Sequence, residues 1–129
     1  MVLVSHSREV AESTAALARA LVGTGDPAPV AAAGGLPDGG VGTSAELVRR
    51  AVAGVDEEAG VVVLCDMGSA VLTVRTLISD KLLDRAGTVR IADAPFVEGA
   101  VAALVTASAG GDLDAVLAAT DDARTYRKL

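Results

Sequence analysis

The chain has 129 residues, a formal net charge of −6 and a hydrophobic content of 51%, in which aromatic residues are scarce, at 2% of the chain. This length favours one domain over residues 1–129, and the acidic balance argues against a nucleic-acid partner, which would require a basic patch. No apolar run approaches the roughly 20 residues of a membrane-spanning helix, so we expect a soluble protein without a membrane segment.

Strand-like and helix-like segments alternate along the chain and are separated by residues that favour turns. The strands are expected at residues 2–5, 29–33, 61–65 and 88–92. The helices are expected at residues 9–22, between Thr43 and Gly54, from the Gly68-Ser69 pair to about Leu83, at 97–107 and at 113–123. The third strand is continuously apolar, which is typical of a central parallel strand covered on both faces.

Two helix starts carry capping signals. Thr43 and Glu46 have the spacing of a capping box, in which Thr43 is the N-cap and Glu46 reaches back to it. Asp112 is expected to cap the last helix.

This alternating order predicts an α/β fold with a four-stranded parallel sheet and helices on both faces. A doubly wound strand order of 2-1-3-4 is the natural choice, with right-handed crossovers. The order of the strands then reverses between the first and third strands, and ligands bind in the crevice at such a point. The loops after those two strands carry His6 and Asp66, so the topology predicts that these side chains are neighbours.

The only histidine of the chain, His6, directly follows the first strand. An imidazole serves as a nucleophile or as a proton carrier near neutral pH. A carboxylate that accepts a hydrogen bond from one ring nitrogen fixes the tautomer and leaves the other nitrogen free to attack. His6 with Asp66 is therefore expected to be able to take up a phosphoryl group.

Three loops supply groups that suit a phosphate. They are Ser5-His6-Ser7, Gly42-Thr43-Ser44 and Asp66-Met67-Gly68-Ser69. Hydroxyls and backbone N–H groups at helix N-termini bind anions, and a glycine lets the backbone approach closely. Taken singly, each loop is better explained by capping or turn formation, and only their convergence on His6 favours a site.

Several other site classes are disfavoured by the sequence. The glycine-rich segment 35–44 lacks the lysine of a phosphate-binding P-loop, and no dinucleotide-binding glycine pattern follows the first strand. Met67 stands where a serine hydrolase would need a glycine before its nucleophile. One histidine and one cysteine do not make a zinc site, so neither a metal nor a cofactor is expected.

The single cysteine, Cys65, cannot form a disulfide within the chain, which fits a reducing cytoplasm. It lies in the apolar third strand, so we expect a buried thiol rather than a reactive one. The first residues lack a secretion signal, which also favours a cytoplasmic location.

Four segments, taken together and in order, resemble a known family. They are Leu3-Val4-Ser5-His6-Ser7, Val41-Gly42-Thr43, Asp66-Met67-Gly68-Ser69-Ala70 and Ala94-Pro95-Phe96-Val97-Glu98-Gly99. The chain resembles the phosphotransferase subunit of the phosphoenolpyruvate-dependent dihydroxyacetone kinase, whose first domain belongs to the mannose-family enzyme IIA group of the phosphotransferase system (PTS). The resemblance covers nearly the whole chain.

This resemblance implies a homodimeric, cytoplasmic domain that carries phosphate on His6, with Asp66 as the partner carboxylate and Ser69 near the phosphate. It places Gly42 and Thr43 at the rim of the site, and Ser7 and Gly68 join them as expected phosphate contacts. The implied phosphate donor is the carrier protein HPr, and the implied acceptor is ADP on the nucleotide-binding subunit of the kinase.

Two alternatives keep the fold and change the role. The chain could be a sugar-transport enzyme IIA of the mannose type that hands phosphate to a IIB partner. It could also be a non-catalytic regulatory module, for which phosphorylation is a signal. The fold alone does not separate these.

Overall fold

Four parallel strands form one sheet in the order β2-β1-β3-β4. The computed structural model describes residues 1–23, 25–55, 58–83 and 88–129. The strands are β1 (Val2–Ser5), β2 (Ala31–Gly34), β3 (Val61–Cys65) and β4 (Val89–Ile91). The helices are α1 (Arg8–Leu21), α2 (Ala45–Val55), α3 (Gly68–Ser79), α4 (Phe96–Ser108) and α5 (Leu113–Ala123). The expected α/β fold and its strand order are confirmed.

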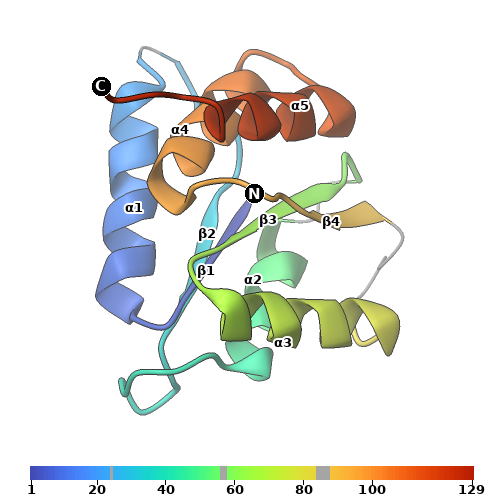
Figure 1. Cartoon of the computed structure of the whole chain (residues 1–129). Coiled ribbons are helices and arrows are strands. Elements are labelled where there is room, and N and C mark those ends of the chain that lie inside the picture. The colour runs from blue at the N-terminus through green and yellow to red at the C-terminus, as the bar shows by residue number, and fades with distance from the viewer. Residues whose placement is uncertain (24, 56–57, 84–87) are drawn as a thin grey trace.

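The sheet is covered on both faces (Figure 1). Helices α1, α4 and α5 pack on one face and α2 and α3 on the other. In β3, Val61, Val63 and Cys65 belong to the core beneath α2 and α3, whereas Val62 and Leu64 belong to the core beneath α1, α4 and α5. Because successive strand side chains point to opposite faces, a strand with two covered faces must be apolar throughout.

Gly34 brings β2 close to the start of α1. It pairs with Ser5 in the parallel register, at the end of both strands. A Cβ atom on Gly34 would lie 2.4 Å from the backbone oxygen of Ser7 and 2.6 Å from Cα of Arg8. Only a residue without a side chain fits so near the backbone, so this glycine fixes the position of the loop that carries His6.

The predicted capping box at Thr43 is wrong. The hydroxyl of Ser44, one residue later, accepts a hydrogen bond from Leu47 N at 3.2 Å, so Ser44 caps α2. Glu46 instead pairs with Arg50 at 2.5 Å on the exposed surface of the helix. Thr43 forms a parallel bridge with Gly35, which holds it in an extension of the sheet rather than at the helix start.

The other element boundaries shift by a few residues at most, except at the end of α3. That helix ends at Ser79 rather than near Leu83, because Lys81 adopts a φ of 54° and Leu82 N bonds back to the carbonyl of Leu77 at 2.9 Å. A left-handed residue followed by such a backward bond is a common way to end a helix. The cap at Asp112 is confirmed, since its carboxylate accepts from Ala115 N at 2.9 Å.

Candidate functional site

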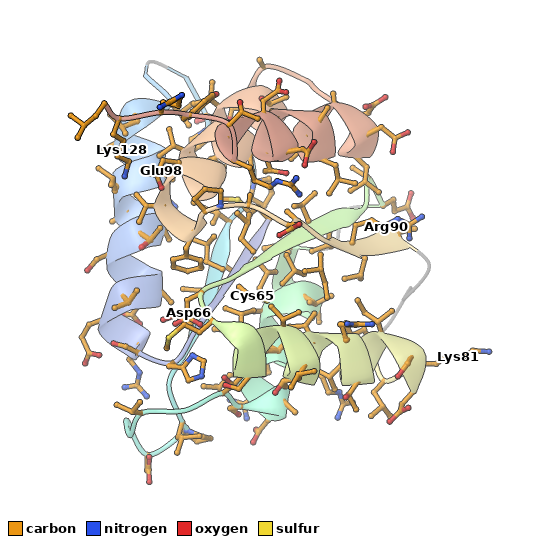
Figure 2. The ribbon with its side chains drawn as sticks, in the orientation of Figure 1. Cys65, Asp66, Lys81, Arg90, Glu98 and Lys128 are labelled. Atoms are coloured by element: carbon orange, nitrogen blue, oxygen red, sulfur yellow. The ribbon has the colours of Figure 1, made fainter. Side chains whose placement is uncertain are left out.

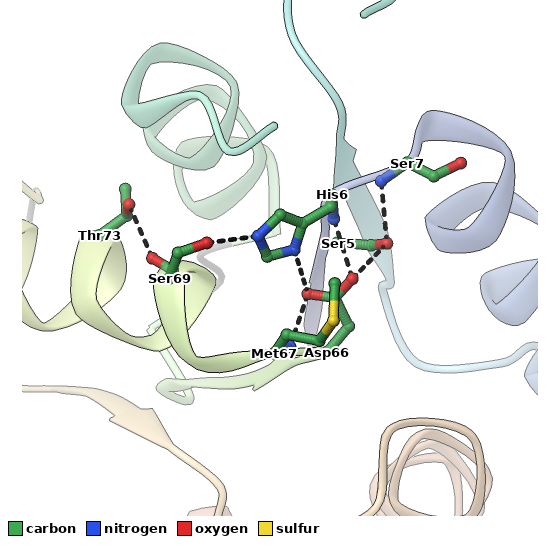
Figure 3. A network of polar contacts seen from close by, with 7 residues as sticks. All are labelled: Ser5, His6, Ser7, Asp66, Met67, Ser69 and Thr73. Atoms are coloured by element: carbon green, nitrogen blue, oxygen red, sulfur yellow. Dashed lines mark hydrogen bonds and ion pairs between the residues drawn. The ribbon is translucent and has the colours of Figure 1, made fainter. Parts of the chain in front are cut away.

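His6 and Asp66 meet because their strands are neighbours. Strands β1 and β3 are paired in parallel, and both end at the same edge of the sheet. The N–H of Asp66 continues the ladder by donating to the carbonyl of Val4 at 3.0 Å. His6 and Asp66, the first residues after β1 and β3, are therefore held side by side. His6 Nδ1 lies 2.9 Å from Asp66 Oδ1. The two residues have the predicted juxtaposition (Figure 3).

Four donors surround the carboxylate of Asp66. The hydroxyl of Ser5 and the backbone N–H of His6 each donate to Oδ2 at 2.9 Å. Oδ1 accepts from the backbone N–H of Met67 at 2.7 Å, and it also faces the ring of His6. Partial burial opposes ionisation of this group, but the hydrogen bonds outweigh it and hold the pKa of Asp66 below its ordinary value of 3.8.

An ionised Asp66 determines the tautomer of a neutral His6 ring. Because a carboxylate with no proton of its own only accepts, the ring must donate from Nδ1. Nε2 then carries the lone pair, and this atom faces the hydroxyl of Ser69 at a short hydrogen-bonding distance (Figure 3). The side chain of His6 is 19% exposed, so the ring is recessed. The geometry leaves one ring nitrogen available as a nucleophile.

The N-terminus of α3 lies beside that nitrogen. Gly68 and Ser69 are the first residues of this helix, so their backbone N–H groups have no acceptor within it. Met67 occupies the N-cap position and provides no side-chain cap. A Cβ atom built on Gly68 would have no neighbour within 4 Å, so there is open space in front of this turn. Such a helix start favours an anion.

Ser7 is occupied by a structural role. Its hydroxyl accepts from Val10 N at 3.3 Å as the N-cap of α1, and it donates to Glu9 at 2.8 Å. Its backbone N–H donates to the hydroxyl of Ser5 at 3.1 Å. Ser7 therefore lies next to the site, but its side chain points away from the ring of His6 (Figure 3).

Gly42 and Thr43 border the site through the backbone. The N–H of Gly42 donates to the carbonyl of His6 at 2.9 Å, and its φ of 151° lies in the range that favours glycine. The hydroxyl of Thr43 is buried and has no hydrogen-bond partner among the described residues. A ligand could reach this hydroxyl only if its surroundings moved.

Ser5 is the residue that the sequence interpretation missed. The sequence predicts Ser5 at the end of the first strand and in the loop Ser5-His6-Ser7, but it does not predict that the side chain is only 1% exposed and bridges Ser7 N–H and Asp66. The one available signal is a hydroxyl at the end of an otherwise apolar strand, since a buried hydroxyl needs partners.

Neighbouring features bear on other kinds of chemistry. Figure 2 shows Cys65 and Asp66 at the same end of β3. Burial and then the nearby charge of Asp66 raise the pKa of the Cys65 thiol to about 12.

In the part of the chain that the structure describes, no three histidine, cysteine or acidic residues gather as metal ligands. None of the helices there is long and apolar enough to cross a bilayer.

Comparison with known proteins decides the family. Residues 1–117 match the family model EIIA-man, described as the PTS system fructose IIA component. The chain belongs to this family. One relative is the phosphoryl donor subunit DhaM of the phosphoenolpyruvate-dependent dihydroxyacetone kinase of Pantoea ananatis, which is 42% identical over an alignment of 121 residues. The match covers 91% of this chain and 25% of that protein. The DhaM protein of Escherichia coli is 38% identical, with the same shares covered.

The resemblance identified from the four sequence motifs is thereby confirmed. The chain spans about a quarter of the length of these two relatives. A DhaM protein of Listeria innocua is 33% identical, and there the match covers 91% of this chain and 92% of the relative. The crystal structure of EF1359, a protein of unknown function, is also similar to this chain, with a TM-score of 0.81 at 25% sequence identity. The match covers 99% of this chain and 96% of the EF1359 chain.

Proposed function

We propose that this chain is the phosphoryl donor subunit of a dihydroxyacetone kinase and that it carries the phosphoryl group on His6. The observation that supports this most strongly is the orientation of the ring, whose Nδ1 faces the anionic Asp66 while Nε2 faces Ser69 at the start of α3. The DhaM relatives are phosphoryl donor subunits of dihydroxyacetone kinases, which supports the choice of kinase.

In the proposed first step, His6 takes the phosphoryl group from a phosphohistidine of HPr. The lone pair on Nε2 forms a new N–P bond while the P–N bond of the donor breaks, and the electron pair of that bond returns to the donor ring. The proton on Nδ1 stays between His6 and Asp66, whose charge stabilises the ring as it becomes positive. Asp66 acts as a fixed anion, since its two oxygens already accept four hydrogen bonds.

The start of α3 receives the phosphoryl oxygens in this proposal. The hydroxyl of Ser69 leaves Nε2 and donates to one oxygen, and the backbone N–H groups of Gly68 and Ser69 face the others. Phosphoryl transfer depends chiefly on such positioning and on neutralising the charge of the equatorial oxygens.

Ser7, Gly42 and Thr43 remain predicted phosphate contacts at the rim. For such a contact, the hydroxyl of Ser7 must release Val10 N–H, and the hydroxyl of Thr43 must turn out of its buried position. Gly42 acts through the backbone, because its N–H holds the loop of His6 in place.

In the second step, an oxygen of the terminal phosphate of ADP attacks the phosphorus, the N–P bond breaks and Nε2 recovers its lone pair. We place this ADP on the nucleotide-binding subunit of the kinase. The chain itself contributes the phosphohistidine and no metal or other cofactor. We further propose that it works as a homodimer in the cytoplasm, which sedimentation analysis and fractionation would test.

The proposal is tested by incubating the chain with phosphoenolpyruvate, enzyme I and HPr and measuring its intact mass. We expect the mass of one added phosphoryl group, which is stable in base and labile in acid. His6→Ala should abolish the adduct and still fold, since the ring is partly exposed and belongs to neither apolar core. An unmodified wild-type protein, or an adduct that survives in His6→Ala, would reject the proposal.

A second candidate is a sugar-transport enzyme IIA that transfers phosphate to a IIB protein. The description of the family model as a PTS fructose component supports it. The phosphorylated chain can be offered either the ADP-loaded kinase subunit or a IIB protein. Transfer to the kinase subunit alone supports the first candidate, and transfer to IIB alone supports the second. Phosphorylation without transfer to either would favour a regulatory role.

A further inference from the structure

We propose that Ser5 is a positioning residue for the phosphoryl transfer and that its buried hydroxyl locks the carboxylate of Asp66 against the ring of His6. This inference rests on the function proposed above for His6. It concerns a residue that does not touch the phosphoryl group and that is only 1% exposed, at the end of β1.

The direction of the hydrogen bonds at Ser5 is fixed by its neighbours. The hydroxyl oxygen accepts from Ser7 N–H at 3.1 Å and lies 2.9 Å from Asp66 Oδ2. The carboxylate has no proton to give, so the single hydroxyl proton of Ser5 must point to Asp66. A backbone amide, a hydroxyl and a carboxylate thus form one chain of bonds in which each member strengthens the next.

This chain prevents rotation of the carboxylate. Oδ2 receives both the hydroxyl of Ser5 and the N–H of His6, so turning the carboxylate away would cost two hydrogen bonds on that side. Oδ1 is thereby held at 2.9 Å from His6 Nδ1. Since Nε2 is on the opposite side of the same ring, the position of the nucleophile depends on how firmly this pair is held.

Ser5 also contributes to the charge of Asp66. Partial burial raises the pKa of this carboxyl, and the hydroxyl of Ser5 is among the donors that offset the burial and bring the pKa below its ordinary value. Removing the hydroxyl should therefore raise the pKa of Asp66. This effect is measurable without any phosphoryl transfer.

The competing explanation is that Ser5 only satisfies the buried N–H of Ser7 at the start of α1. A matched control exists at Ser108 at the end of α4, whose hydroxyl accepts from Ala28 N at 2.9 Å and thus also satisfies a backbone amide. Ser108→Ala removes the same kind of bond without touching Asp66.

The experiment compares Ser5→Ala, Ser5→Thr and Ser108→Ala with the wild-type chain. The pKa of the Asp66 carboxyl is measured by carbon-13 NMR titration, and kcat and KM are measured with phosphorylated HPr. We expect Ser5→Ala to raise the pKa of Asp66 and to lower kcat on the order of tenfold, as small misplacements of reacting groups do. KM should not change, because a buried hydroxyl does not contact the partner. Ser5→Thr keeps a hydroxyl and should therefore leave the pKa of Asp66 and kcat near their wild-type values. Ser108→Ala should alter neither the pKa nor kcat.

A folded Ser5→Ala with the wild-type pKa of Asp66 and the wild-type kcat would overturn the inference. If Ser5→Ala does not fold, Ser5→Cys replaces it, because a thiol has nearly the same size and is a weak donor. Ser5→Cys should then shift both quantities in the same directions, and wild-type values would overturn the inference equally. A wild-type chain that accepts no phosphate contradicts the proposed function instead, and the pKa comparison still decides whether Ser5 holds Asp66.

Discussion

The proposed chemistry depends on which ring nitrogen of His6 carries its proton. Asp66 settles this because it is an anion whose oxygens already accept from Ser5, from Met67 and from the backbone of His6 itself. A neutral acceptor in the same place would hold the ring but would not stabilise it once it becomes positive. An amide at position 66 would lack the charge and would also replace one of the two accepting oxygens.

Asp66→Asn is expected to slow phosphoryl transfer while the protein still folds at pH 7. The hydrogen bond from the His6 ring would then go to a neutral amide instead of a carboxylate. This removes about 2 kcal/mol of stabilisation from the positive ring in the transition state. This corresponds to a rate lower by roughly 30-fold. Rapid-quench kinetics with phosphorylated HPr measures the change. Asp112→Asn is the matched control, since Asn is an equally good helix cap and Asp112 is remote from the site. Wild-type kinetics in Asp66→Asn would remove Asp66 from the mechanism.

The lowered pKa of Asp66 predicts how acid affects stability. Because folding lowers this pKa, the ionised carboxylate stabilises the folded state above the unfolded pKa, and that stabilisation is lost as the pH falls through about 4 toward the folded value. Urea unfolding at pH 7 and pH 3 should therefore show a larger loss of stability for the wild type than for Asp66→Asn. An equal loss in the two proteins would contradict the assignment.

Cys65 is expected to be inert in the folded protein. Burial and the charge of Asp66 raise the pKa of its thiol to about 12, so almost no thiolate exists at pH 8. Iodoacetamide should leave the thiol unmodified in buffer and alkylate it fully in urea, as intact mass would show. Rapid alkylation of the folded protein would contradict the burial of Cys65 at the end of β3.

At the scale of elements, the site depends on how closely β2 approaches the start of α1. Gly34 allows this approach, because a methyl group there would meet the backbone of Ser7 and Arg8 at 2.4–2.6 Å. Neighbouring backbone atoms have little freedom to move away. The loop of His6 is consequently positioned by a strand that contributes no functional side chain.

Gly34→Ala should destabilise the protein by about 1–3 kcal/mol, as overpacking does. It should also slow phosphoryl transfer by His6, because the backbone that must shift belongs to Ser7, which directly follows His6 in the chain. Gly54→Ala in α2 is the control, because its methyl group would meet nothing within 4 Å. Alanine is also the better helix former there. Urea midpoints and transfer rates measure both effects, and similar midpoints for the two variants would refute this role of Gly34.

The sequence predicted the elements better than their ends. Short apolar runs indicate the strands and helical apolar spacing indicates the helices, but Thr43 and Ser44 both fit a helix cap. The choice between them depends on the bridge from Thr43 to Gly35, a contact distant in sequence. Leu82 and Leu83 likewise extend the apolar pattern of α3 beyond the point where Lys81 turns the chain. These outcomes depend on tertiary contacts and not on local spacing.

The site, too, could be predicted only in part from the sequence. His6 and Asp66 could be paired because parallel neighbouring strands end at one edge of a sheet, which topology alone dictates. The role of Ser5 could not be predicted, because it depends on burial and on hydrogen-bond direction. The hydroxyl of Ser7 also proved ambiguous, since a helix cap and a phosphate contact have the same sequence signature.

On the scale of the whole molecule, the residues of the proposed site gather at one edge of the sheet. His6 and Asp66 follow β1 and β3, the N–H of Gly42 bonds to the loop of His6, and α3 begins at Gly68. Two apolar cores, one on each face, hold the strands in register behind this edge. In the proposed mechanism, the fold holds the ring of His6 so that Nε2 can accept the phosphoryl group.

The most direct test of this account is a long-range proton–nitrogen NMR spectrum of the 15N-labelled chain before and after phosphorylation. A single histidine gives one pair of ring nitrogen signals, so the assignment is unambiguous. We expect the neutral ring to be protonated at Nδ1 before the reaction and to carry phosphorus on Nε2 afterwards. A ring protonated at Nε2 at the start, or phosphorus on Nδ1, would contradict the account.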